Sequence, residues 1–374
     1  MSKIETILIS QISLPLSQGF ADAKVATGRQ TALTSVDVLA VEITAETGEI
    51  GVGFSYTLRA GGSAFYALAK EIGPMLIGKD GSDIAALWEK LAWRTNSLGA
   101  GGLAYQVIAA FDSALWDLKA KEAYLPLAKL LGAFRQSSPV YNSGGQYLQA
   151  SIEEMQTAAK ASVSRGIGGI KMKVGQPDWR DDITRIEAVR EAIGPDIALM
   201  IDANQQWSRD EAIRFCRRVD HLGLTFIEEP LDARDYQGHQ ILTLALDTPV
   251  ASGEMLTSYH EISEMVLQKG VRVLQPDAPR IGGITPFLRV IELANTHKLG
   301  MAPHFVMEQH IHLMCVNPTE GWVEHFDWLE PLFEERFKLK DGRIWLNTDH
   351  GFGLTLSDKA REFTLNCEKL EKYE

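Results

Sequence analysis

The sequence contains little of what defines several large classes of protein. It has three cysteines, Cys216, Cys315 and Cys367, and none belongs to a CxxC pair, so neither a disulfide framework nor a zinc site is expected. No run of about 18 apolar residues is present to span a bilayer. The opening stretch MSKIETILISQISLPL lacks the apolar core and cleavage site of a signal peptide. We therefore expect a cytoplasmic protein.

An excess of positive charge is also missing. With 37 Lys and Arg against 49 Asp and Glu, the chain has a net charge of −12 at pH 7. A chain of this kind offers no broad basic surface to displace counterions from a nucleic acid, and we expect neither a nucleic-acid nor a membrane partner. An anionic substrate would have to be attracted locally, by a metal ion or by a few Lys and Arg side chains.

What the 374 residues do contain is a change of rhythm along the chain. Residues 1 to about 60 read as strands, including two around a turn at Thr47–Gly48, and residues 63 to about 131 have helical spacing, which together indicate an α+β unit. From Val140, short apolar runs alternate with helical patterns. The eight runs are VYN, GGIKMKV, IALMIDAN, LTFIEE, PVASGE, RVLQPD, LGMAPH and GWVEHF.

Eight βα units favour a closed α/β barrel, and the alternative is an open doubly wound sheet. The glycine-rich pieces GAGG (99–102) and RIGGI (280–284) do not match a dinucleotide fingerprint, which argues against a Rossmann fold. The rhythm breaks again near Asp327. We predict three segments: an N-terminal unit over 1–130, a barrel over 131–326, and a tail over 327–374 that returns to the first unit.

Ionisable residues stand at the ends of the predicted barrel strands, on the face where such barrels build active sites. They are Lys171, Lys173, Asp202, Glu228, Glu254, Asp277, His304 and Glu324.

Asp202, Glu228 and Glu254 follow one another at equal intervals, so three carboxylates should converge. Alone they would repel one another, and Mg²⁺, which takes carboxylate oxygens and keeps positions for substrate, would resolve the repulsion. The alternative is that each is a helix-capping acid.

Lys171 and Lys173 lie one residue apart in GGIKMKVG, so a strand would point both to the same face. Beside three carboxylates and a dication, two ammonium groups are compensated, and their mutual repulsion would lower the pKa of a lysine base. The alternative is a solvated strand edge. His304, one strand after Asp277, is expected to be an acid/base whose tautomer Asp277 fixes. We take His310 and His312 as structural.

The motifs KMK, DAN, EEP, GE, PDAPRIGGI, PH and WVEHFDWL, in this order, resemble the mandelate racemase subgroup of the enolase superfamily. The resemblance implies a modified TIM barrel, (β/α)7β, with an α+β capping domain formed from the N-terminal segment and the C-terminal tail. It also implies that Asp202, Glu228 and Glu254 bind Mg²⁺ and that the enzyme forms an enediolate, as the superfamily does.

The resemblance further implies a role for each remaining strand end. Lys173 and His304 would be bases on opposite faces of the substrate, with Lys171 lowering the pKa of Lys173 and contacting the substrate carboxylate. Glu324, in its protonated form, would donate a hydrogen bond to that carboxylate. Asn204 would contact the substrate or the metal shell.

The stretches DAKVATGRQ, GVGFSY and RAGG are similar to the galactarate/L-talarate dehydratases, which implies a carbon–oxygen lyase acting on a sugar diacid. Lys24, Arg29 and Arg59 are then candidates to bind the distal carboxylate from a lid, and a homo-oligomer is expected. The alternatives are a racemase or epimerase of an α-hydroxy acid, a dehydratase for another hexarate or aldonate, and a barrel kept only for binding.

Overall fold

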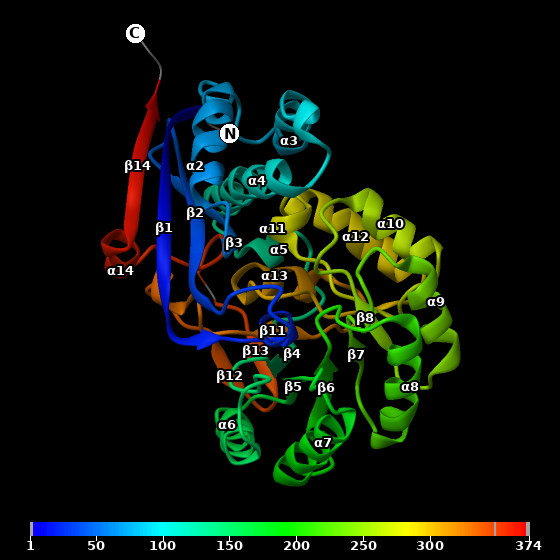
Figure 1. Ribbon diagram of the computed structural model, residues 1–374. Coiled ribbons are helices and arrows are strands. Elements are labelled where there is room, and N and C mark those ends of the chain that lie inside the picture. Colours follow the sequence, from blue (N-terminus) through cyan, green and yellow to red (C-terminus); the bar gives the residue numbers. More distant parts are fainter. Residues whose placement is uncertain (1–2, 348, 372–374) are drawn as a thin grey trace.

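Both ends of the chain contribute to one antiparallel sheet (Figure 1). The computed structural model describes residues 3–347 and 349–371. The sheet has the order β14-β1-β2-β3, and its strands are β1 (Ile4–Phe20), β2 (Leu33–Ala45), β3 (Ile50–Leu58) and β14 (Thr364–Glu371). The turn expected at Thr47–Gly48 joins β2 to β3.

Helices cover this sheet and complete the cap. They are α1 (Ala23–Ala26), α2 (Gly62–Ile72), η1 (Gly73–Leu76), α3 (Ile84–Arg94), η2 (Asn96–Leu98), α4 (Gly102–Glu122) and α5 (Leu127–Leu130). The long helix α4 approaches β3 closely because Gly51 and Gly53 have no side chain. A Cβ on Gly53 would lie 2.2 Å from the Ala110 carbonyl oxygen of α4.

Eight parallel strands form the second unit, in the neighbour order β10-β9-β8-β7-β6-β5-β4-β11. A backbone hydrogen bond from Trp322 to Met301 joins the β11 side to β10 and closes the ring. The strands are β4 (Ser137–Asn142), β5 (Gly169–Lys173), β6 (Ala198–Asp202), β7 (Ile227–Glu228), β8 (Val250–Ser252), β9 (Val273–Leu274), β10 (Gly300–Met301) and β11 (Val323–His325).

The helices between these strands begin at recognisable signals. Ser151 and Ser208 each form a capping box with the glutamate three residues later, which fixes the first turns of α6 and α8. The helices are α6 (Ile152–Ser164), α7 (Trp179–Ile193), α8 (Arg209–Val219), η3 (Asp220–Leu222), α9 (Tyr236–Ala245), α10 (Tyr259–Leu267), α11 (Ala278–Ile281), α12 (Ile284–Thr296) and α13 (Met307–Val316). The predicted modified TIM barrel with an α+β cap is confirmed.

The C-terminal tail contacts both units. It contains η4 (Glu330–Leu332), β12 (Lys338–Lys340), β13 (Arg343–Trp345) and α14 (Asp358–Glu362) before β14. Strand β13 pairs with barrel strand β4, whereas β14 pairs with β1 of the cap. The segment boundaries 1–130, 131–326 and 327–374 stay a prediction.

Polar contacts fasten the cap to the barrel. Asp112 of α4 accepts hydrogen bonds from the backbone and hydroxyl of Thr285, at the start of α12. The Gln309 amide of α13 donates to the Phe54 carbonyl of β3. The cap is therefore held beside the ends of the barrel strands. Among the described residues, none of the helices is both long and apolar enough to cross a membrane.

Candidate active site

Three neighbouring strands end with the residues that the sequence singled out. Lys173 of β5 is paired in register with Asp202 of β6, and Asp202 with Glu228 of β7. Lys171 lies two residues before Lys173 and points to the same face, and all four side chains are buried. Parallel pairing therefore brings two ammonium groups and two carboxylates to one point, as predicted.

Each lysine has a carboxylate partner. The Lys171 Nζ lies 2.7 Å from both carboxylate oxygens of Glu228 and 2.7 Å from Glu324, while Lys173 donates to Asp202. Burial alone would lower the pKa of Lys173, and Lys171 adds to that effect, but the charges of Asp202, Glu228 and Glu254 together raise the pKa. Lys171 acts on the pKa of Lys173 in the predicted direction, but the neighbouring carboxylates make the net shift upward.

The three predicted metal ligands are buried, and their charges affect one another's pKa. Glu254 stands two residues beyond β8 and is buried like Asp202 and Glu228. Burial, followed by repulsion from Asp202, raises the pKa of Glu228 well above its usual range, although Lys171 opposes the change. Burial also opposes ionisation of Asp202, but Lys173 and Lys171 more than offset it and lower that pKa.

The donor set suits a hard dication. It comprises three buried carboxylates and the Asn204 Oδ1, a buried oxygen with no hydrogen-bond partner among the described residues. As the side chains stand, no group of three His, Cys, Asp or Glu within residues 3–347 and 349–371 is placed to hold a metal ion. The lysine ammonium groups draw the carboxylate oxygens toward themselves, so an ion bound there must replace some of these contacts.

His304 and Asp277 form the expected pair. The His304 Nδ1 lies 2.8 Å from Asp277 Oδ2, and the Nε2 lies 3.4 Å from Glu254 Oε2. The other Asp277 oxygen accepts the Arg280 backbone N–H and caps α11. Burial would raise the pKa of Asp277, but the His304 hydrogen bond and the Arg280 charge lower it. An ionised Asp277 keeps the proton on Nδ1 and leaves Nε2 to face the cavity.

Glu324 of β11 lies against Lys171. Its oxygens lie 2.7 Å from the Lys171 Nζ, 2.5 Å from the Ser143 hydroxyl and 2.6 Å from the Phe305 backbone nitrogen. Burial alone would raise its pKa, but the charges of Lys171 and His304 and these hydrogen bonds lower it to about 2. The donation of a hydrogen bond from a protonated Glu324 to substrate stays a prediction; in this structure β11 lies beside β4 and brings the carboxylate to Lys171.

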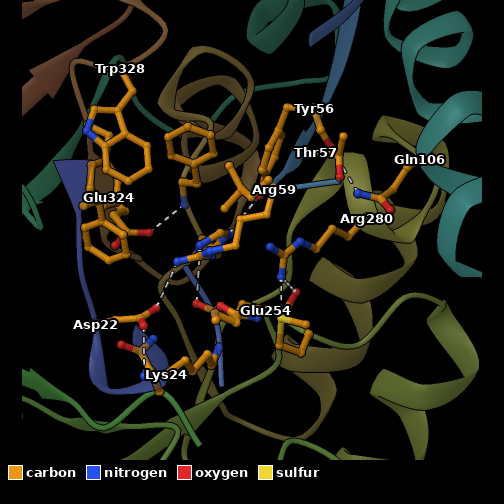
Figure 2. A pocket seen from close by; sticks show the side chains of 18 of the residues that line it. Asp22, Lys24, Tyr56, Thr57, Arg59, Gln106, Glu254, Arg280, Glu324 and Trp328 are labelled. Carbon is orange, nitrogen blue, oxygen red and sulfur yellow. Dashed lines mark hydrogen bonds and ion pairs between the residues drawn. The ribbon is translucent and has the colours of Figure 1, made fainter. Parts of the chain in front are cut away.

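These groups open on a cavity of about 400 Å³ (Figure 2). Its walls come from both units, and among its lining residues are Lys24, Tyr56, Arg59, Lys171, Lys173, Asn204, Glu254, Arg280, His304 and Glu324. Arg59 approaches Asp22 with 3.9 Å between Nη2 and Oδ2. Arg29 is not among the lining residues. Its side chain is exposed, and its guanidinium donates to Gln206 at 3.2 Å.

Several residues at the site were missed by the sequence argument. The Gln275 amide donates to Glu228 at 2.6 Å, and its position two residues before Asp277 could have indicated it. Arg280 lines the cavity, and its guanidinium donates to the Glu254 carbonyl at 2.7 Å. Tyr56 contacts Asp277 from the cap, and no local pattern links residues so far apart in the chain. His310 accepts the Ala278 N–H, which agrees with a structural role.

Comparison with known proteins places the whole chain beside one group. Residues 21–132 match the mandelate racemase / muconate lactonizing enzyme N-terminal domain, and residues 154–360 match the enolase C-terminal domain-like family. The chain is 51% identical over 367 residues to an L-talarate/galactarate dehydratase of Salmonella typhimurium, covering 98% of this chain and 92% of that protein.

Two solved structures are similar to this chain over its full length. The Salmonella typhimurium LT2 enzyme, liganded with Mg and L-lyxarohydroxamate, has a TM-score of 0.98 at 50% identity and covers 100% of this chain and 95% of its own. L-Talarate dehydratase from Polaromonas sp. JS666, complexed with Mg and L-glucarate, has a TM-score of 0.97 at 51% identity, with 100% of both chains covered.

Proposed function

This chain belongs to the mandelate racemase / muconate lactonizing enzyme family of the enolase superfamily, and on that premise we propose a Mg²⁺-dependent acid-sugar dehydratase. The substrate is galactarate, L-talarate or both, and the product is a keto-deoxy sugar acid. The observation that carries this proposal is that Lys173, His304 and Glu254 line one cavity, and that Asp202 and Glu228 are buried against the lysines of the same site. A binding protein has no need of two such bases.

We propose that Asp202, Glu228 and Glu254 hold the Mg²⁺, which the buried donor set supports. The bound ion supplies positive charge where an enediolate develops. Lys171 adds an ammonium group at the same point, and Glu324 orients it by a direct contact. Such preorganised charge contributes on the order of several kcal/mol to stabilisation of the transition state.

Lys173 and His304 then move the protons. Lys173 reaches the cavity from β5, and His304 reaches it from the segment after β10. In the ring of strands, β4 and β11 lie between β5 and β10 on one side, and four strands lie between them on the other. One base removes the proton α to the carboxylate. The hydroxyl on the next carbon leaves as water with a proton from an acid side chain, and the enol becomes the 2-keto-3-deoxy acid. Return of a proton from the opposite base would instead give the epimer.

The distal carboxylate of a diacid needs its own cation. Lys24 and Arg59 line the cavity on the cap side (Figure 2), and the buried Arg59 Nη2 has no hydrogen-bond partner among the described residues. We propose that these two residues bind the distal carboxylate. Arg29, bonded to Gln206, instead secures the cap segment to the barrel. Asn204 contacts the substrate or the metal shell.

The setting of the enzyme is also a proposal. A net charge of −12 supports a small anionic substrate drawn in by local cations, rather than a nucleic acid or a membrane surface. We propose a cytoplasmic homo-oligomer.

The test is a library of acid sugars, including monoacids, assayed for keto-acid formation with Mg²⁺ and with EDTA. We expect keto acid from galactarate or L-talarate only when Mg²⁺ is present. Absence of keto acid from every acid sugar, or formation that EDTA does not reduce, would contradict the proposal. Inverted substrate that carries solvent deuterium, without keto acid, would favour the racemase alternative.

A further inference from the structure

Tyr56 of the cap reaches the His304–Asp277 pair from outside the barrel. Its hydroxyl donates to Asp277 Oδ2 at 2.5 Å, the same oxygen that lies 2.8 Å from His304 Nδ1. The hydroxyl oxygen is also 3.2 Å from His304 Nδ1. Because the hydroxyl proton is directed at Asp277, the remaining lone pairs of this oxygen face the Nδ1 proton. Tyr56 therefore contacts both members of the pair.

The tyrosine is fixed from several directions. Its backbone carbonyl accepts the Gln106 amide of α4 at 3.2 Å, and its position in β3 is opposite Val38 of β2. Its ring packs edge-on against Phe305, the residue after His304, with 4.7 Å between ring centroids. The side chain is fully buried, so its hydroxyl has little freedom to leave the pair.

We propose that Tyr56 is a positioning residue for His304: it holds Asp277 and the imidazole in the orientation that directs Nε2 into the cavity. This inference rests on the proposed function. Burial is the main reason that the pKa of Tyr56 lies well above its usual range, so the hydroxyl keeps the proton that it donates. Through this contact, a residue of the cap sets the orientation of one of the two proposed bases.

The second base provides an internal reference. Lys173 is held by Asp202, whereas the Tyr56 hydroxyl contacts Asp277 and His304. Loss of the Tyr56 hydroxyl should therefore impair proton transfer at His304 and spare proton transfer at Lys173. A purely structural role in supporting the fold would reduce both together.

The experiment uses the full-length enzyme with Mg²⁺ and follows solvent deuterium entering carbon α of galactarate and of L-talarate. His304→Asn and Lys173→Ala first establish which substrate depends on which base. Tyr56→Phe, which keeps the ring, is expected to slow exchange on the His304 side by about tenfold, the usual effect of removing an outer hydrogen-bond partner. Exchange on the Lys173 side should stay within about twofold, by the same argument.

Ser55→Ala is the matched control. It removes a hydroxyl from the neighbouring buried position of β3, and the Ser55 Oγ has no hydrogen-bond partner among the described residues. It should leave both sides unchanged. Equal slowing of both sides by Tyr56→Phe, a larger loss on the Lys173 side, or no loss at all would overturn the inference. If the wild type forms no keto acid from either substrate, the proposed function fails instead.

Discussion

Individual residues show how buried charges are tolerated at this site. Lys171 and Lys173 would be costly inside a protein alone, yet each ammonium group lies against a carboxylate. The same contacts shift the pKa values, since Lys171 lowers the pKa of Glu324 and Asp202, with Glu228 and Glu254, raises the pKa of Lys173. Charge at each residue thus depends on a partner from another strand.

A substitution of Arg59 tests the proposed distal-carboxylate contact. Arg59→Gln should raise the KM for a sugar diacid by about tenfold, because a charge-assisted hydrogen bond contributes about 1.5–3 kcal/mol. The KM for an aldonate, which lacks the second carboxylate, should change little. Steady-state kinetics with both substrates measures the difference.

Arg29→Gln is the matched control, because Arg29 carries the same charge on a neighbouring loop of the cap but is bonded to Gln206 and does not line the cavity. It should affect the diacid much less than Arg59→Gln does. The assignment would be wrong if both variants raised the two KM values alike.

The sequence predicted those residues whose positions follow from strand geometry. Asp202, Glu228 and His304 come at the ends of apolar runs, and parallel strands bring such ends together. The contact of Glu324 with Lys171 could not be predicted, because it depends on which strands are neighbours across the closed ring. Tyr56 could not be predicted either, because its contact with Asp277 depends on how the cap is seated.

At the scale of elements, the close approach of α4 to β3 packs the interior of the cap. Gly51 and Gly53 permit this approach, and Tyr56 lies on the same strand three residues beyond Gly53. The elements themselves were easier to predict than their contacts, since the βα rhythm is local. The pairing of β13 with β4 was not foreseen, because a three-residue strand in the tail has too short a pattern.

Gly53→Ala tests this close approach. The new methyl group would lie 2.2 Å from the Ala114 backbone nitrogen as well as from the Ala110 carbonyl oxygen, so strand and helix must separate. Such overpacking costs roughly 1–3 kcal/mol or more, which should lower the midpoint of thermal unfolding by several degrees. Circular dichroism on heating measures the shift.

Gly19→Ala in β1 is the comparison, because the nearest heavy atom to its added methyl group would be 3.9 Å away. Its unfolding midpoint should match that of the wild type. Equal midpoints for the two variants would show that β3 and α4 do not need the glycine.

At the scale of the whole molecule, an acidic protein places several Lys and Arg side chains around one cavity. The net charge is −12, yet Lys24, Arg59, Lys171, Lys173 and Arg280 all line the cavity between cap and barrel. The strand ends carry the residues proposed as metal ligands and bases, while the cap carries the proposed substrate contacts and the Tyr56 contact to the His304–Asp277 pair. Both units are therefore needed for a complete site.

The proposed function depends most on one divalent cation shared by Asp202, Glu228 and Glu254. A crystal structure with Mn²⁺, which favours the same oxygen ligands as Mg²⁺ and can be located by its anomalous scattering, measures this directly. We predict one anomalous peak in contact with a carboxylate oxygen of each of the three residues. A peak elsewhere, or Asp202 and Glu228 still bonded to the two lysines with no ion among the three carboxylates, would contradict the account.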